Sequence, residues 1–308
     1  MSITGKRVLV TGGAGFIGSH IADALVTDND VTVLDDLSSG SRANVPEGAT
    51  FVEGATFVEG DVRNLADLAQ AGDVDVIFHE AAVVSVAKSV EDPAGCHDVT
   101  TDGTIQALEF ARQQDARIVT ASSAAIYGDP ETIPVSEDEP KRPSSPYGVD
   151  KLTIDHYTRL YADLYDLPTV ALRYFNVYGP RQTAGDYSGA VSVFRRQAQS
   201  GEPLTVHGDG SQTRDFVHVE DVVRANLEAA TTDATGDAYN VGTGEETSIL
   251  ELAETVRDVT GSDSEIVHED AREGDIERSL ADISKAREQL GYEPSVDLQT
   301  GLGTLVQQ

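Results

Sequence analysis

The residues of this chain whose types and spacing best suggest proton chemistry are Tyr147 and Lys151, four positions apart. On a helix this spacing places the phenol and the ammonium on one face. A free phenol has a pKa of about 10, so a base at neutral pH needs nearby positive charge that favours the phenolate. The ammonium and a positively charged cofactor ring could supply that charge. Without a cofactor site, the same pair would be read as a partly buried tyrosine beside a surface lysine.

A hydroxyl that could assist this pair follows an apolar segment, residues 117–120, which we expect to be a strand. The segment leads to Ser122 and Ser123, and the carboxyl ends of strands in open α/β sheets are where ligands bind. These serines, together with Tyr147 and Lys151, are therefore the candidates for a catalytic set.

A glycine-rich segment near the N-terminus suggests a phosphate cradle. Gly12, Gly15 and Gly18 follow a predicted strand over residues 7–11 and open a predicted helix. Glycines let the backbone approach a pyrophosphate closely, and the helix presents free N–H groups and a positive dipole end to the anion. Phe16 and Ile17 lie in the same turn, so we expect all five residues to bind the cofactor.

The acidic residue that ends the second predicted strand indicates which dinucleotide binds. Asp35 lies twenty residues after Gly15. A carboxylate there accepts hydrogen bonds from a ribose diol and would repel a 2′-phosphate. We therefore predict NAD rather than NADP, with Asp36 as the neighbour that could take this role instead.

The elements that must position these residues alternate along the first half of the chain, as expected for a parallel sheet wrapped by helices. The predicted fold is a Rossmann-type, doubly wound α/β sheet. We expect an NAD-binding domain over residues 1–176, to which the chain returns later. A smaller, partly interleaved C-terminal portion over 177–308 would bind the substrate. Predicted strands cover 7–11, 31–34, 74–78, 117–120 and 169–173; predicted helices cover 64–71, 103–113, about 145–165 and 248–260.

Two local patterns leave their interpretation open. Leu152, Tyr157, Leu160, Tyr161 and Leu164 form an apolar stripe at helical spacing, which is typical of a core face or of a dimer surface. The segment 48–53 is repeated at once as 54–59; we expect the second copy to be the third strand and the first to be a loop extension.

The charge balance excludes several classes of partner. The 308 residues carry 53 acidic and 22 basic side chains, a formal net charge of −31. Such a surface repels nucleic acid and anionic lipid. It also repels itself unless salt screens it, so we expect adaptation to a salt-rich cytoplasm; the alternative is an acidic protein from an ordinary cell.

The cysteine and the histidines exclude two further kinds of site. The single cysteine, Cys96, excludes an intramolecular disulfide, and the histidines lack metal-ligand spacing, so no metal site is predicted. The N-terminal residues run into an apolar strand without a signal-peptide pattern, which predicts a cytoplasmic protein without a membrane span.

Taken together, these motifs make the chain resemble the extended short-chain dehydrogenase/reductases of the nucleotide-sugar epimerase/dehydratase group, and within it the UDP-glucose 4-epimerases. The resemblance covers nearly the whole chain. Besides the cradle and the proposed catalytic set, it rests on residues 60–62, 79–82, 173–181, 213–219, 240–242 and 272–275. Glu80 departs from the pattern, because the family usually has an apolar residue there.

The resemblance implies roles for matching positions. Tyr147 would be the acid/base, Lys151 its electrostatic partner and ribose contact, and Ser123 a hydrogen-bond donor to the sugar. Asp61, Val62 and Ala81 would contact NAD. Asn176, Arg214 and Arg272 would hold the nucleotide diphosphate of a UDP-sugar. The family also suggests a homodimer formed by paired long helices.

The residues after Ser123 separate related activities. Dehydratases and decarboxylases of this group carry acidic residues there, whereas this chain has Ala124 and Ala125. Since elimination needs a proton donor and a base beyond the tyrosine, the sequence favours 4-epimerisation of UDP-glucose and UDP-galactose. A small Ser279 suggests room for N-acetylated sugars. The alternatives are another nucleotide-sugar epimerase, such as a UDP-glucuronate 4-epimerase, and a catalytically silent NAD-binding regulator.

Overall fold

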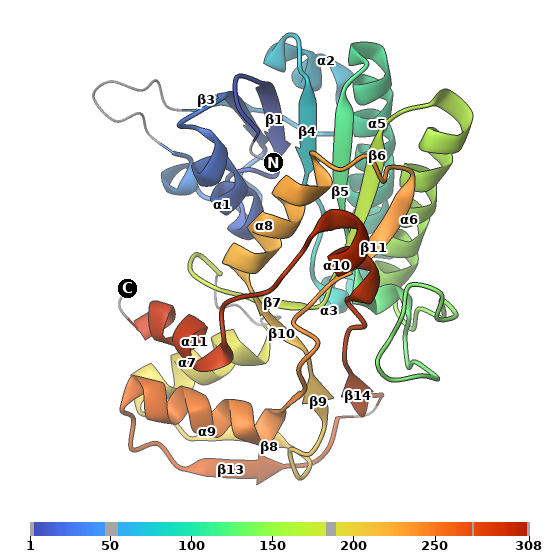
Figure 1. The fold of residues 1–308 in the computed structure, drawn as a ribbon. Coiled ribbons are helices and arrows are strands. Elements are labelled where there is room, and N and C mark those ends of the chain that lie inside the picture. The colour runs from blue at the N-terminus through green and yellow to red at the C-terminus, as the bar shows by residue number, and fades with distance from the viewer. Residues whose placement is uncertain (1–2, 47–54, 183–188, 273, 307–308) are drawn as a thin grey trace.

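The fold is that of a computed structural model, which describes residues 3–46, 55–182, 189–272 and 274–306 (Figure 1). A seven-stranded sheet forms the larger lobe, and shorter strands and helices form a smaller lobe beneath it in this view. Among the described residues, no helix combines the length and the apolar character that crossing a bilayer requires.

The central sheet is parallel throughout, with the strand order β11-β6-β5-β4-β1-β2-β3. This order confirms the prediction of a doubly wound Rossmann-type sheet. The strands are β1 (Arg7–Thr11), β2 (Asp30–Asp35), β3 (Thr56–Glu59), β4 (Val76–His79), β5 (Arg117–Ser123), β6 (Thr169–Tyr174) and β11 (Asp237–Val241). All their carboxyl ends therefore meet at one edge of the sheet.

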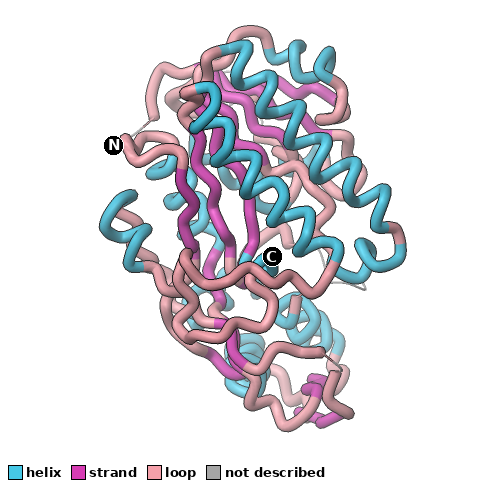
Figure 2. The backbone as a smooth tube through the Cα atoms, turned by 90° about the vertical axis from the view of Figure 1, so that its right-hand side faces the viewer, coloured by secondary structure: helices cyan, strands magenta, loops and turns pink. Residues whose placement is uncertain are grey.

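Helices cover both faces of this sheet, as the ribbon and the tube show (Figures 1 and 2). On one face α1 (Phe16–Leu25) packs against α8 (Val219–Ala229); on the other lie α2 (Leu65–Leu68), α5 (Gly103–Gln114) and α6 (Pro146–Tyr165). Short helices complete this lobe: α3 (Val86–Glu91), α4 (Pro93–His97) and α10 (Ser284–Leu290). Each face buries its own apolar core, which is why the strands read as nearly continuous apolar runs.

The smaller lobe has a separate core and three short sheets. Its helices are α7 (Ala190–Ser200), α9 (Ile249–Thr260) and α11 (Leu298–Val306). Its strand pairs are β7 (Asn176–Tyr178) with β10 (Phe216–His218), β8 (Leu204–His207) with β13 (Ile266–Glu269), and β9 (Thr213–Arg214) with both β12 (Thr247–Ser248) and β14 (Arg278–Ser279). The chain leaves β6 for this lobe and returns through α8 and β11, so residues after 176 contribute to both lobes.

The long helix α6 begins and ends where the sequence predicts. The Ser145 side chain caps it by accepting a hydrogen bond from the Gly148 N–H, and Pro146 occupies its first turn. A left-handed Asp166 ends it. The second copy of the duplicated segment forms β3, as predicted, whereas the first copy lies outside the described residues.

The apolar stripe of α6 is a core face only in part. Tyr161 is buried, but Leu160 and Leu164 are 44% and 61% exposed. The face turned to the sheet instead carries Lys151 and Asp155, both buried. The core-face interpretation is therefore wrong at Leu160 and Leu164, because polar groups of α6 find partners in the sheet, and the dimer-surface alternative stays a prediction.

Candidate active site

The three predicted catalytic residues meet at the carboxyl edge of the sheet. Ser123 ends β5, and the first turns of α6 bring Tyr147 and Lys151 beside it. The Lys151 Nζ donates a 2.7 Å hydrogen bond to the carbonyl oxygen of Ala121 in β5. It lies 5.9 Å from the centre of the Tyr147 ring. The four-residue spacing on one helix thus has the consequence that the sequence predicts.

A hydrogen bond from α3 holds the start of α6. The Tyr147 N–H donates a 3.0 Å hydrogen bond to the Ser89 hydroxyl, which in turn donates to the Val86 carbonyl. Ser89 is completely buried. Because one of the orphan N–H groups of the first helical turn is satisfied in this way, the position of Tyr147 depends on a residue far away in the sequence.

The surroundings of Tyr147 shift the pKa of its phenol in two opposite directions. Burial raises the pKa of the Tyr147 phenol, and a hydrogen bond with Ser123 lowers it. The Ser123 Oγ also accepts a 3.1 Å hydrogen bond from the Ala125 N–H, so its orientation is held. Because burial prevails, the phenolate needs further positive charge, for which Lys151 and a positively charged cofactor ring are the candidates.

The glycine-rich turn has the shape that a dinucleotide cradle requires. Gly12 has a φ of +67°, and a Cβ there would lie 2.7 Å from the backbone nitrogen of Ala81. A Cβ at Gly18 would overlap the carbonyl oxygen of Gly12. Gly15 is the N-cap of α1 and no side chain caps this helix, so the first-turn N–H groups that include those of Phe16 and Ile17 lack an intrahelical acceptor. These residues fit the pyrophosphate of NAD.

Asp35, at the end of β2, is held against this cradle. One carboxylate oxygen accepts a 2.9 Å hydrogen bond from the Ala14 N–H and the other a 2.8 Å bond from the Leu37 N–H. A carboxylate offers about four acceptor positions, so these backbone donors leave acceptor capacity for a ribose diol. Asp36 is exposed and accepts from the Ser38 N–H. The geometry supports Asp35 over Asp36 for this contact.

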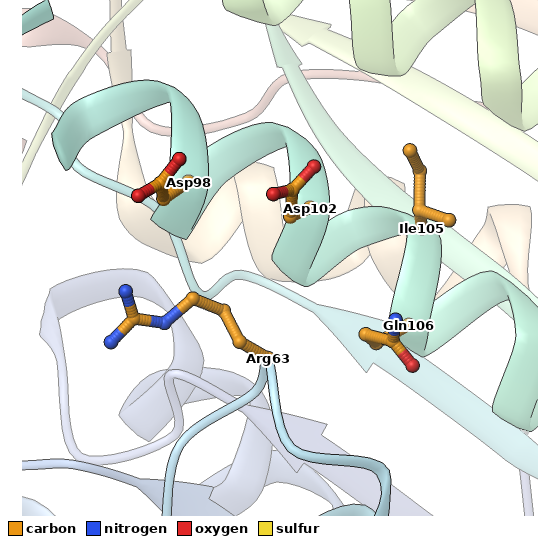
Figure 3. Close-up of a pocket in the computed structure, with 5 residues that line it drawn as sticks. All are labelled: Arg63, Asp98, Asp102, Ile105 and Gln106. Carbon is orange, nitrogen blue, oxygen red and sulfur yellow. The ribbon is translucent and has the colours of Figure 1, made fainter. Parts of the chain in front are cut away.

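The expected adenine border lies beside a polar pocket of about 310 Å³ (Figure 3). Asp61 pairs with Arg63 at 2.5 Å, and Val62 is buried where a Cβ on Gly103 would be only 2.6 Å from it. The pocket is lined by Arg63, Asp98, Asp102, Ile105 and Gln106. None of the catalytic set lines it, whereas Arg63, the partner of Asp61, does.

His79 supports the cradle from inside the sheet, a role that the sequence analysis did not assign. The Thr104 hydroxyl donates to the Thr100 carbonyl, so it must accept from the His79 Nε2, and the Nδ1 accepts from the Thr11 hydroxyl. Burial lowers the pKa of His79 to about 3, which keeps the ring neutral. This neutral ring joins β1, β4 and α5 behind the cradle.

The residues expected to hold the nucleotide diphosphate lie in or beside the smaller lobe. Asn176 donates through its backbone and side chain to the Asp215 carbonyl. Arg214 bonds the carboxylate of Asp275 and two carbonyl groups. Arg272 is exposed and bonds the His207 Nε2 at 3.0 Å. A diphosphate would therefore compete with Asp275 for Arg214, whereas Arg272 could bind it by giving up only a histidine.

Asp215 organises this region although it faces no predicted ligand. Its buried carboxylate accepts hydrogen bonds from the N–H groups of Thr243, Gly244 and Ala281 and from the Thr243 hydroxyl. These contacts join β10 to the segments that follow β11 and β14. The sequence signal for this role is an acidic residue between Arg214 and an apolar strand.

A buried ion pair between Asp155 and Arg173 was also missed. Two hydrogen bonds of 2.8 and 3.0 Å join them, and both side chains are almost inaccessible. Asp155 also accepts from the Ser122 hydroxyl, directly before Ser123. The signal that could have found it is its position four residues after Lys151, on the same face of α6.

Comparisons with known proteins identify the relatives of this chain. Residues 8–242 match the NAD dependent epimerase/dehydratase family. The chain is 40% identical to the UDP-glucose 4-epimerase of Mycolicibacterium smegmatis, over 98% of this chain and 97% of that protein.

Solved structures agree with the sequence match. A UDP-N-acetylglucosamine 4-epimerase from Methanobrevibacter ruminantium, in complex with UDP-N-acetylmuramic acid, superimposes with a TM-score of 0.93 at 36% identity, covering 99% and 98% of the two chains. The Thermus thermophilus UDP-glucose 4-epimerase complex with NAD gives a TM-score of 0.86 at 38% identity, covering 97% of each chain. With its cradle and its sheet in place, the chain belongs to the NAD-dependent epimerase/dehydratase family.

Proposed function

We propose that this protein is an NAD-dependent 4-epimerase of UDP-sugars that works through a 4-keto intermediate. The observation that carries the proposal is the meeting of Ser123, Tyr147 and Lys151 at the sheet edge where the dinucleotide cradle also opens. The UDP-sugar 4-epimerases among its relatives support it.

Each residue of the site has its own role in the proposed epimerisation. Gly12, Gly15, Gly18 and Asp35 would hold NAD, which would supply a reversible hydride acceptor for C4 of the sugar. The Tyr147 Oη takes the proton of the 4-hydroxyl while C4 is oxidised to the ketone, and returns it when the ketone is reduced. The Ser123 Oγ donates a hydrogen bond to the same sugar oxygen, and Lys151 supplies positive charge that stabilises the phenolate. Asn176, Arg214 and Arg272 hold the UDP while the sugar turns over between the two half-reactions.

The residues beside Ser123 support epimerisation over elimination. Ala124 and Ala125 form the short turn that Ser123 caps, so neither a carboxyl acid nor a carboxylate base follows the serine. The complete Ser, Tyr and Lys set supports an enzyme over a silent NAD-binding regulator. A UDP-glucuronate 4-epimerase is the second candidate, because it would use the same catalytic set.

The range of sugars is expected to include N-acetylated forms. Ser279 lies in β14, paired in register with Arg214 of β9. This places a small side chain next to a residue proposed to hold the nucleotide, where a bulky one would narrow the site.

The test supplies UDP-glucose, UDP-galactose, UDP-N-acetylglucosamine and UDP-glucuronate in molar KCl and follows each sugar by NMR. We expect the first two to interconvert, and no turnover of either would defeat the assignment. Tyr147→Phe should lower turnover by about 10²–10⁴-fold. Tyr165→Phe is the matched control, because it removes a hydroxyl from an exposed position of the same helix.

We also propose a homodimer. The side chains that support it are exposed apolar residues on the neighbouring helices α3 and α6: Val86, Val90, Val149, Leu160 and Leu164. Such clusters are typical of protein interfaces. Sedimentation at high salt should give twice the chain mass, and Leu164→Glu should shift the mass towards the monomer.

A salt-rich cytoplasm is proposed as its environment. The net charge of −31 supports this, since about 1 M salt reduces the Debye length to about 3 Å and screens the repulsion. The single cysteine accords with a reducing compartment.

A further inference from the structure

The inference concerns Glu80, an acidic side chain next to the proposed catalytic set that the mechanism above does not use. It follows β4, and its N–H donates to the Thr11 carbonyl directly before the cradle. Its carboxylate extends to the end of β6, where the Tyr174 hydroxyl donates to the Oε1 at 2.8 Å. Because β5 lies between β4 and β6, this contact crosses the end of β5, which is the strand that holds Lys151.

The hydrogen bonds that lead from Asn226 through Tyr174 to Glu80 each have a defined donor and acceptor. The Asn226 Nδ2 donates both to the Val222 carbonyl and to the Tyr174 hydroxyl, at 2.9 and 2.8 Å. Since the Val222 carbonyl can only accept, it fixes the orientation of the Asn226 amide. The Tyr174 hydroxyl already accepts from that amide and directs its own proton to Glu80. The chain of donors from α8 thus ends on Glu80 as an acceptor, which favours its ionised form.

Glu80 is also the acidic group best placed to act on Lys151. Burial disfavours the charged forms of both groups, lowering the pKa of Lys151 and raising that of Glu80, while their mutual attraction opposes both shifts. Asp150 also faces Lys151 but is bound to the His97 Nδ1 at 2.7 Å. Among the described residues, the other titratable groups that face Lys151 are Tyr147 and His79, and neither is a carboxylate.

We propose that Glu80 is a positioning residue that holds Lys151 in its ammonium form, so that Tyr147 has a cationic neighbour while it exchanges its proton. The inference rests on the proposed function, because it assigns Glu80 to the acid–base step of the same site. The buried carboxylate of Glu80 also has a hydrogen-bond donor of its own in Tyr174, which Asn226 orients.

The direct test follows Lys151 itself by NMR of lysine labelled with ¹³C at Cε, on protein with bound NAD. The chain has only five lysines, and Lys151→Met assigns the signal. In Glu80→Gln the Lys151 signal should titrate at a pH lower by about one unit or more, since an opposite charge at close range shifts a pKa by about 1–3 units. Tyr174→Phe removes the donor to Glu80 and should shift it in the same direction by less.

The kinetic readout is the pH profile of kcat/KM. Its alkaline limb should move to lower pH in Glu80→Gln, by the amount seen in the lysine titration, because Lys151 loses its proton earlier. Glu254→Gln, which neutralises an exposed glutamate of α9, should change neither. Glu80→Asp keeps a carboxylate and should show a smaller shift than Glu80→Gln. A side chain that only fills space would not produce this difference.

A Lys151 titration that is the same in the parent, Glu80→Gln and Tyr174→Phe overturns the proposal. The outcome stays separable from that of the proposed function, since the titration needs no turnover. A parent that binds NAD but epimerises nothing defeats the function and leaves the lysine titration readable. An active parent with an unmoved Lys151 defeats only the role of Glu80.

Discussion

The buried ion pair between Asp155 and Arg173 allows a stability change to be worked out from the structure. Asp155→Asn keeps the shape of the side chain and removes its charge. Asp155 is fully buried and Arg173 is 2% exposed, so the guanidinium would be left buried without an anion. Breaking a pair of this kind costs about 3–5 kcal/mol of unfolding free energy. At about 2 °C per kcal/mol for a chain of this size, Tm should fall by about 6–10 °C.

The assay is thermal and denaturant unfolding in molar KCl, where screening removes surface charge effects. Asp163→Asn, at an exposed position of the same helix, is the matched control and should change Tm by less than about 1 °C. Replacing both partners, as in Asp155→Leu with Arg173→Met, should recover much of the loss because no buried charge is left unpaired. Arg159, which also pairs with Asp155 at 3.1 Å, is partly exposed and can be solvated by water. If Asp155→Asn lost no more stability than the control, the reasoning would be refuted.

The pH dependence of the same pair has a definite sign. Burial raises the pKa of Asp155, but the hydrogen bonds and charge of Arg173, with the charge of Arg159 and the Ser122 hydrogen bond, outweigh it, so the folded-state pKa lies below the ordinary value of 3.8. Its contribution to stability is therefore complete above about pH 4 and is lost as pH falls through the folded-state pKa. Asp155→Asn should remove this part of the acid unfolding curve.

Four further outcomes are expected. Gly18→Ala gains about 1 kcal/mol of helix propensity, but its new Cβ clashes with the Gly12 backbone, so NAD should dissociate from this variant on gel filtration. Gly303→Ala is the control and should retain NAD, because a Cβ there has no other atom within 4 Å. Asp35→Asn should raise the affinity for NADP relative to NAD by about tenfold or more, measured by calorimetry; an unchanged ratio would argue for Asp36. Ser279→Tyr should raise KM for UDP-N-acetylglucosamine and leave that for UDP-glucose nearly unchanged in the NMR assay. Dialysis from molar KCl into dilute buffer should lower Tm, and a Tm indifferent to salt would contradict the proposed salt-rich environment.

Features that depend on short spacings could be predicted from the chain before its fold was known. The cradle glycines, the Tyr147 and Lys151 face and the Ser145 cap each involve residues within one helix or one turn, and the structure places them as local geometry requires. Alternating strands and helices likewise predicted the parallel sheet.

The tertiary structure alone decided the contacts that join distant strands. Nothing in the chain near Glu80 reveals that Tyr174 will donate to it, because that contact exists only once β5 lies between β4 and β6. The Asp155 and Arg173 pair and the Asp215 carboxylate depend in the same way on which segments the fold brings together. Local spacing fixes which side chains share a face, whereas a buried charge is tolerated only where the assembled fold supplies its partner, and that is settled by strand order.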